Sequence, residues 1–224
     1  MTSPRSRRPA IAASLAARLL ARTKPAEAVT LIGKARLDLT VPLNADALAT
    51  LVEILGQVGR HDHTIARANA AVAAFPAFGR FHAIRATGLM GSGAATAEVR
   101  AVLERAVELD EDLATALIAL GRLDQAKGSV DAAVARFDQA TLGTPGDPEA
   151  QWAAVTALIA AGRETEADAR LEKLVGRHVE HAEAVKLMAR RLEAREDESE
   201  RAQQYSNLAE RLRGIMERSE RPSR

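Results

Sequence analysis

The 224-residue chain contains 47% hydrophobic but only 3% aromatic residues, carries a formal net charge of +1 and has no cysteine. Its apolar content is ample for a core and consists mainly of small and aliphatic residues, which favour closely packed helices. The lack of cysteine excludes disulfides, thiolate metal sites and thiol nucleophiles, and the near-neutral charge gives no electrostatic reason to expect nucleic-acid binding.

The first 26 residues form a basic segment without an acidic residue. Its basic residues are Arg5, Arg7, Arg8, Arg18, Arg22 and Lys24. We interpret residues 1–8 as a basic flexible tail that precedes the first helix. An Arg-rich, acid-free segment is also typical of a cleaved leader that targets an organelle. Otherwise we expect a cytoplasmic protein, and the preference for Arg over Lys together with the high alanine content indicates a bacterial source.

No apolar run of this chain reaches the length of about 18–20 residues that spans a membrane. Instead, a spacing of small residues, Gly and Pro recurs with a period close to 34 residues. The clearest unit is 114–147, which carries at positions 8, 15, 20, 24, 27 and 32 the residues Gly121, Gly128, Ala133, Phe137, Ala140 and Pro145. In chain order, the units are 9–42, 45–78, 80–113, 114–147, 148–181 and 182–215.

This spacing is expected of two antiparallel helices that pack against each other. Positions 4, 8 and 11 share one face of the first helix, and positions 20, 24 and 27 share one face of the second. Small residues at positions 20 and 27 let the two backbones approach, glycine at position 15 frees the turn, and proline near position 32 ends the second helix. One such pair cannot bury its apolar face alone, so neighbouring pairs must stack.

The pattern resembles the tetratricopeptide repeat, and the resemblance covers residues 9–215. It implies an all-α fold, a right-handed superhelical solenoid of antiparallel helix pairs with about five to six repeats. The usual aromatic residue at position 4 is missing in every unit. Position 11 of the unit 114–147 is Asp124, where the adjacent Leu123 is expected to supply the packing.

The C-terminal residues 198–217 are dense in charge but keep a helical apolar pattern. Tyr205, Leu208, Leu212 and Ile215 recur at the spacing of one helix face. We therefore predict a C-terminal capping helix that covers the last repeat. A flexible tail is expected over residues 216–224.

The sequence contains no pattern typical of a catalytic, cofactor or metal site. His61 and His63 fall in a predicted turn, and His178 and His181 fall between two units, where a metal site would need further converging donors. The glycine-rich residues 88–93 follow no predicted strand and are not expected to bind phosphate. We predict a protein that is not an enzyme and needs no cofactor.

A second stripe on the first helix of each unit, at positions 2, 5, 9 and 12, is the candidate binding surface. In proteins of the resembled family this stripe lines the concave groove and binds extended peptides or partner helices. The predicted partner-binding residues on or beside it are Phe81, Ile84, Arg85, Ile118, Arg122, Trp152, Ile159 and Arg190. The apolar side chains would anchor a partner and the arginines would pair with its carboxylates. Alternatively, the apolar side chains pack against neighbouring helices, because a register error of one residue rotates a helix by about 100°.

Together, these patterns favour a non-catalytic protein-binding scaffold, an adaptor or assembly factor that holds a partner peptide or helix in its concave groove. One alternative is a regulatory subunit that docks on an enzyme such as a sulfotransferase or glycosyltransferase. Another is a scaffold that assembles into a homo-oligomer through its terminal helices. Nucleic acid is not an expected partner, because beyond residue 26 the chain has 25 basic and 30 acidic residues.

Overall fold

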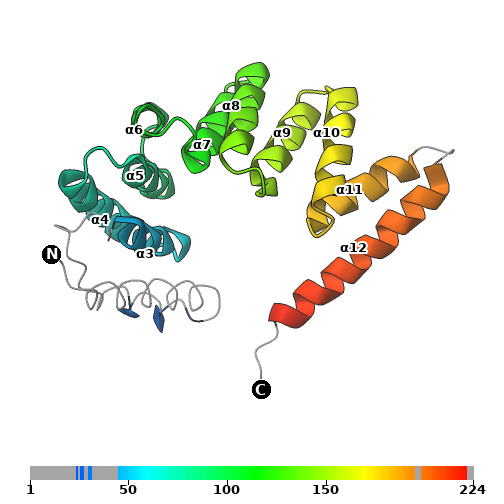
Figure 1. The fold of residues 1–224 in the computed structure, drawn as a ribbon, viewed down its shortest axis with the longest axis horizontal. Helices are drawn as coiled ribbons and strands as arrows, with labels where there is room; N and C mark the ends of the chain where they lie inside the picture. Colours follow the sequence, from blue (N-terminus) through cyan, green and yellow to red (C-terminus); the bar gives the residue numbers. More distant parts are fainter. Residues whose placement is uncertain (1–23, 25, 28–29, 32–44, 195–197, 221–224) are drawn as a thin grey trace. The chain divides into compact units, whose positions relative to one another are not determined.

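Helices are the regular structure of this chain in a computed structural model that describes residues 24, 26–27, 30–31, 45–194 and 198–220. In chain order they are α3 (Ala45–Gln57), α4 (His61–Ala74), α5 (Gly79–Gly91), α6 (Thr96–Leu109), α7 (Ala114–Ala126), α8 (Val130–Gly143), α9 (Pro148–Ala160), α10 (Glu164–Arg177), α11 (Ala182–Glu193) and α12 (Ser199–Glu220) (Figure 1). Over the described residues no strand occurs, and the all-α prediction is confirmed.

The chain forms two compact units, one ending at Leu123 and the other beginning at Asp124. The predicted basic tail lies outside the described residues, as does almost all of the predicted helix pair over residues 9–42. Among the described helices, none has both the length and the apolar character needed to cross a membrane.

In the first unit, α5 is packed on two sides. Apolar residues of α3, α4 and α5 form one buried cluster, which includes Val52, Ala68 and Phe81. A second cluster joins α5 and α6 to the start of α7, and it includes Leu103 and Leu120. Because both clusters draw on α5, this helix buries most of its circumference.

Glycine ends the first helix of four helix pairs. Gly59, Gly93, Gly128 and Gly162 have φ angles of 75°, 78°, 80° and 72°, in the left-handed region that glycine adopts at little cost. Three of them stand at position 15, as predicted. In the predicted unit 80–113, position 15 is Ala94, and the left-handed residue is instead the preceding Gly93.

This difference reflects one extra residue in the α5–α6 turn. The turn comprises residues 92–95, whereas the turns that follow α3, α7 and α9 have three residues each. Consequently α5 begins at Gly79 and not at position 80, where the sequence spacing placed it. Every side chain of α5 is therefore rotated by about 100° from its predicted direction.

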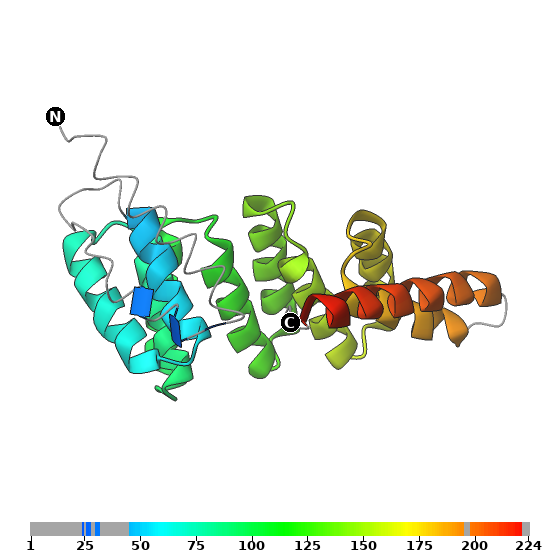
Figure 2. The same cartoon turned by 90° about the horizontal axis from the view of Figure 1, so that it is seen from below.

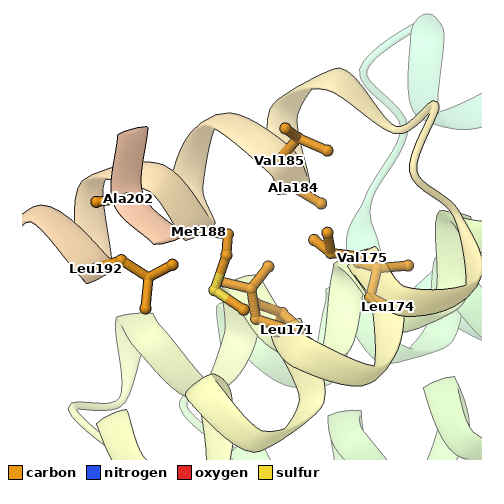
Figure 3. Packing of buried hydrophobic residues seen from close by; sticks show 9 residues of the cluster. Leu171, Leu174, Val175, Ala184, Val185, Met188, Leu192 and Ala202 are labelled. Carbon is orange, nitrogen blue, oxygen red and sulfur yellow. The ribbon is translucent and has the colours of Figure 1, made fainter. Parts of the chain in front are cut away.

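In the second unit, α11 packs onto the hairpin of α9 and α10. Leu171, Leu174 and Val175 of α10 face Val185 and Met188 of α11 in a cluster of buried side chains (Figure 3). The partly buried side chains of α12 at Tyr205, Leu208 and Leu212 pack against the same cluster. The predicted capping helix is therefore present, with its apolar face on the preceding helices.

Arginines of this unit join neighbouring helices through ion pairs. Arg191 of α11 contacts Asp168 and Glu164 of α10 at 2.7 Å and 2.5 Å. At the start of α10, hydrogen bonds from Arg163, the residue before the helix, hold the pKa of the Glu166 carboxyl below its ordinary value. Stabilisation by this pair is complete above the carboxyl's unfolded-state pKa and is lost as the pH falls through the lowered value.

Asp124 is a buried acidic residue of α7 at repeat position 11, where the other units carry an apolar residue. The residue is 7% exposed, and its Oδ2 accepts a hydrogen bond of 2.7 Å from Nε of Arg136 on α8. The neighbouring Leu123 is half-buried against the apolar cluster of α6 and α7, as predicted. The polar residue at position 11 is thus accommodated by an ion pair.

At its C-terminal end α12 continues to Glu220, so residues 216–220 are helical and the predicted flexible tail over 216–224 begins too early. Arg213 lies 4.0 Å from Glu217 one turn later, and Arg218 in the last turn complements the negative end of the helix dipole. The next residue that would stop a helix is Pro222.

Two glycines allow a direct check of the packing. A Cβ on Gly79 would lie 2.7 Å from the carbonyl oxygen of Ala106, a backbone atom that cannot swing away. We expect Gly79→Ala to lower the free energy of unfolding by about 1–3 kcal/mol. Gly176→Ala, in an exposed turn of α10 where a Cβ meets nothing within 4 Å, should raise it by about 0.5–1 kcal/mol. Urea denaturation of the full chain tests both, and equal effects would contradict the described packing.

Candidate functional site

The predicted anchors Phe81 and Ile84 lie in the core and not on a binding surface. They are 0% and 3% exposed and belong to the cluster shared by α3, α4 and α5. The ring of Phe81 lies 5.9 Å from that of Phe75 and 5.0 Å from that of Phe78. The prediction that these two side chains contact a partner is corrected, because the register of α5 differs by one residue.

With α5 starting at Gly79, positions 2, 5, 9 and 12 become Arg80, Ala83, Thr87 and Met90. Arg80 donates two hydrogen bonds to Glu53 of α3, at 2.8 Å and 2.7 Å. Thr87 and Met90 are exposed. The predicted Arg85 is half-buried beside this stripe. Gly93, one residue before the expected turn position, was the sequence signal for the shift.

Of the two predicted partner-binding residues on α7, one lies in the core and one on the surface. Ile118 is buried, with 8% of its surface exposed, and so it is not an open anchor either. Arg122 lies on the exposed side of the same helix. The register of α7 is as predicted, so the burial of Ile118 does not come from a shift of register.

The glycine-rich residues 88–93 serve the packing of α5 against α4. A Cβ on Gly88 would lie 2.9 Å from Cγ1 of Ile65, and one on Gly91 would overlap the ring of His61. Since neither glycine carries a side chain, the two helices can approach closely. Their contacts are with α4, which accounts for these glycines without a phosphate ligand.

Trp152 and Ile159, predicted on α9, are both half-buried against the cluster between α10 and α11. The indole ring lies 5.2 Å from the imidazole ring of His181. Nδ1 of His181 accepts a hydrogen bond of 3.1 Å from the backbone N–H of Ala184 and thereby caps α11. Trp152 therefore packs against the residue that caps the N-terminus of α11.

His178 is buried at the end of α10, with its Nδ1 3.4 Å from Glu180. Among the residues that the structure describes, no three His, Asp or Glu side chains lie close enough together to hold a metal ion. His61 and His63 begin α4 and do not lie in the predicted turn. His61 packs beside Gly91 and His181 caps α11, whereas His63 is exposed.

A cleft of about 460 Å³ lies between α11 and α12. It is lined by Ala182, Glu183, Lys186, Ala189, Arg190, Glu193, Ser206, Ala209, Glu210, Arg213 and Glu217. Glu183, Lys186, Arg190 and Glu193 are positions 2, 5, 9 and 12 of the predicted unit 182–215. The stripe proposed from the sequence therefore lines a real cleft on α11, and Arg190 is the one predicted residue that it contains.

Chemically, this cleft has a small-residue floor and charged walls. Ala189 is buried, and Ala182 and Ala209 are half-buried. Ser206 donates a hydrogen bond of 2.9 Å to Oε1 of Glu193. Lys186 and Arg190 are exposed and make no ion pair with the described part of the chain. Two cations are thus available for carboxylates that enter the cleft.

The cleft is the repeat equivalent of the surface that α11 covers one hairpin earlier. Trp152, Val155 and Ile159 of α9, with Val175 of α10, belong to the cluster in which α11 is packed. The residues 34 positions later are Lys186, Ala189, Glu193 and Ala209, and all of them line the cleft. The cleft therefore stands where a further helix would pack on α11 and α12.

Residues 126–191 match the sequence model of the tetratricopeptide repeat family. The chain is similar to the solved structure of TTC0263, a thermophilic TPR protein of Thermus thermophilus, at 19% identity and a TM-score of 0.65 over 82% of this chain and 97% of that one. It is also similar to PilF of Pseudomonas aeruginosa, at 18% identity and a TM-score of 0.66 over 75% and 76% of the two chains.

A third similar structure is MamA, at 19% identity and a TM-score of 0.53 over 70% of this chain and 90% of that one. Among curated proteins, no sequence matches the chain. At these identities the solved structures establish the fold, an array of paired helices, and the predicted resemblance is confirmed.

Proposed function

We propose that this chain holds a helical segment of another protein in the α11–α12 cleft, because residues 126–191 match the tetratricopeptide repeat family, whose fold typically serves as a scaffold for protein–protein interaction. The chain acts in this proposal as a non-catalytic adaptor or assembly factor. The binding site proposed here is the charged stripe of α11, and not the apolar residues of the central repeats that the sequence suggested.

The equivalence of the cleft to the surface beneath α11 supports a helical occupant. On α9 and α10 that surface already holds a helix, which inserts Val185, Met188 and Leu192. The same positions recur 34 residues later around an unfilled space. A segment with the shape of α11 is therefore the occupant that this geometry fits best.

The residues that line the cleft indicate which side chains the partner helix should carry. Ala182, Ala189 and Ala209 present methyl groups only, so the backbone of the incoming helix can approach closely. Lys186 and Arg190 stand on the wall, so an acidic residue of the partner beside them gains charge-assisted hydrogen bonds. We expect an amphipathic helix with a narrow apolar stripe and acidic residues at its margin.

Affinity capture from lysate of the source cell tests this proposal. The intact chain is compared with Lys186→Glu/Arg190→Glu, and Lys173→Glu/Arg177→Glu makes the same charge change on the exposed side of α10. We expect the intact chain and the control to retain the same protein, and the cleft variant to retain about tenfold less or none, since each lost charge-assisted bond is worth about 1.5–3 kcal/mol.

Equal retention by all three proteins would place the interface elsewhere and contradict the proposal, as would the absence of any retained protein. Circular dichroism of the cleft variant checks that its helices are intact. If the retained protein is an enzyme whose rate changes when the chain binds, the scaffold is more narrowly a regulatory subunit, the alternative that the sequence left open.

A further inference from the structure

The charges that line the α11–α12 cleft lie at definite levels along it. The two helices run antiparallel (Figures 1 and 2), and the hydrogen bond of 2.9 Å between Ser206 and Glu193 fixes their register. Both helices rise by about 1.5 Å per residue, so a step back along α11 is matched by a step forward along α12. Lys186, seven residues before Glu193, is therefore level with Arg213, seven residues after Ser206. Two cations thus stand on the two walls at the middle of the cleft.

Two carboxylates mark the end of the cleft at which α11 begins. Glu217 is eleven residues after Ser206 and is level with Ala182, eleven residues before Glu193. Glu183 follows Ala182 directly, and all three residues line the cleft. This acidic end lies about one helical turn, or roughly 5 Å, from the cationic middle.

Towards the other end of the cleft the charges largely offset one another. Arg190 and Glu210 are opposite in sign, and their levels differ by one residue. The carboxylate of Glu193 already accepts the hydrogen bond of Ser206. The cleft therefore has a positive middle and a negative end, and an occupant meets both.

These four charges are available to an occupant. Within the part of the chain that the structure describes, Glu183 and Lys186 make no ion pair. Arg213 and Glu217 approach each other only to 4.0 Å, and their side chains are 71% and 63% exposed. An exposed pair at this distance contributes little, so its loss to a better partner costs little.

The repeat itself does not require the two cations. On the surface that α11 covers, 34 residues earlier, the equivalents of Lys186 and Arg213 are Trp152 and Val179. Both are apolar, and Trp152 packs against the cluster that holds α11. An occupant of the cleft therefore meets a cation where α11 meets an indole ring, so it needs charges that α11 does not need.

We propose that the helix held in this cleft carries an acid and a base one turn apart. The acidic residue is level with Lys186 and Arg213, and the basic residue, three or four positions away, is level with Glu183 and Glu217. Charge-assisted pairs form at both levels, and a helix that is only acidic meets repulsion at the negative end. The inference rests on the proposed function, since it specifies the charges of the same partner helix.

Two synthetic peptides test this charge pattern. Both are amidated, fluorescein-labelled helices of alanine, leucine and glutamine, about 18 residues long so that they can fold, with one glutamate at the centre. The first also carries a lysine four residues from the glutamate, and the second has glutamine there. Fluorescence anisotropy with the full chain at low ionic strength, where charges are least screened, gives both dissociation constants. We expect the Glu/Lys peptide to bind about three- to tenfold more tightly than the Glu/Gln peptide.

Variants of the chain assign that preference to the acidic end. Glu183→Gln/Glu217→Gln should abolish the preference for lysine and leave the binding of the Glu/Gln peptide unchanged or stronger. Glu98→Gln/Glu200→Gln removes two exposed first-turn acids outside the cleft and should keep the preference. Lys186→Glu/Arg190→Glu should bind neither peptide.

The outcomes separate this inference from the proposed function. Equal affinities of the intact chain for the two peptides, or a preference that survives in Glu183→Gln/Glu217→Gln, would overturn the inference. The proposed function would then still stand, provided that Lys186→Glu/Arg190→Glu loses the Glu/Gln peptide. Failure of both peptides to bind the intact chain would contradict both proposals.

Discussion

Phe81→Ala is expected to lower the free energy of unfolding of the first unit by about 3–5 kcal/mol. The side chain is 0% exposed and fills the space where α3, α4 and α5 meet. Its removal leaves a cavity beside the rings of Phe75 and Phe78, whose aromatic contacts are lost as well. Thermal and urea denaturation of the full chain measure the loss, and hydrogen exchange of α3 to α5 locates it.

Met90→Ala is the matched control on the same helix. Met90 is 40% exposed, so its truncation should change the free energy of unfolding by less than about 1 kcal/mol. Similar effects of the two substitutions would contradict the described register of α5. The comparison also separates stability from binding, since Phe81→Ala should act on the fold and leave capture by the folded protein unchanged.

Arg136→Leu should destabilise the second unit by about 3 kcal/mol, because it leaves the buried carboxylate of Asp124 without its guanidinium. The side chain of Asp124 is only 10% exposed, so water cannot replace the lost partner fully. Arg136 is 30% exposed, and its own truncation removes little apolar packing. Urea denaturation at neutral pH gives the change in free energy.

The double variant Asp124→Leu/Arg136→Leu should recover most of that loss. It places leucine at position 11, the residue that α9 and α11 carry there as Leu158 and Leu192, both buried. Replacing a buried ion pair by apolar side chains is often neutral or stabilising, whereas breaking the pair is not. A double variant as unstable as Arg136→Leu would argue that the fold needs the carboxylate itself.

Much of the helical architecture could be predicted because the residues that begin and end each helix lie next to it in the sequence. Gly128 and Gly162 occupy the turns, and Pro148 begins α9 with Asp147 as its cap. The register of α5 could not be derived from the repeat length alone. One inserted residue in a turn leaves the period nearly intact, and only the position of Gly93 distinguishes the two registers.

The candidate site was less predictable, for a physical reason. Phe81, Ile84 and Ile118 are apolar, as anchors on a binding surface would be. Whether such a side chain is exposed or buried depends on the neighbouring helices, which the sequence of one helix does not reveal. Apolar character was therefore a poor guide to exposure in an array where most helix faces are covered. Lys186 and Arg190 lie on the same stripe of α11, and the 34-residue period makes Lys186 the repeat equivalent of Trp152, which packs against the cluster that holds α11.

The extra residue between α5 and α6 has a consequence for how such a chain can change length. The helix pair forms although its connection is one residue longer than those of α3–α4, α7–α8 and α9–α10, so pairing depends on the helix faces and not on the connection. Insertions and deletions in the turns should accumulate over evolution with little harm. The same single insertion inside α5 would turn all the residues that follow it by about 100° and bring the core to the surface.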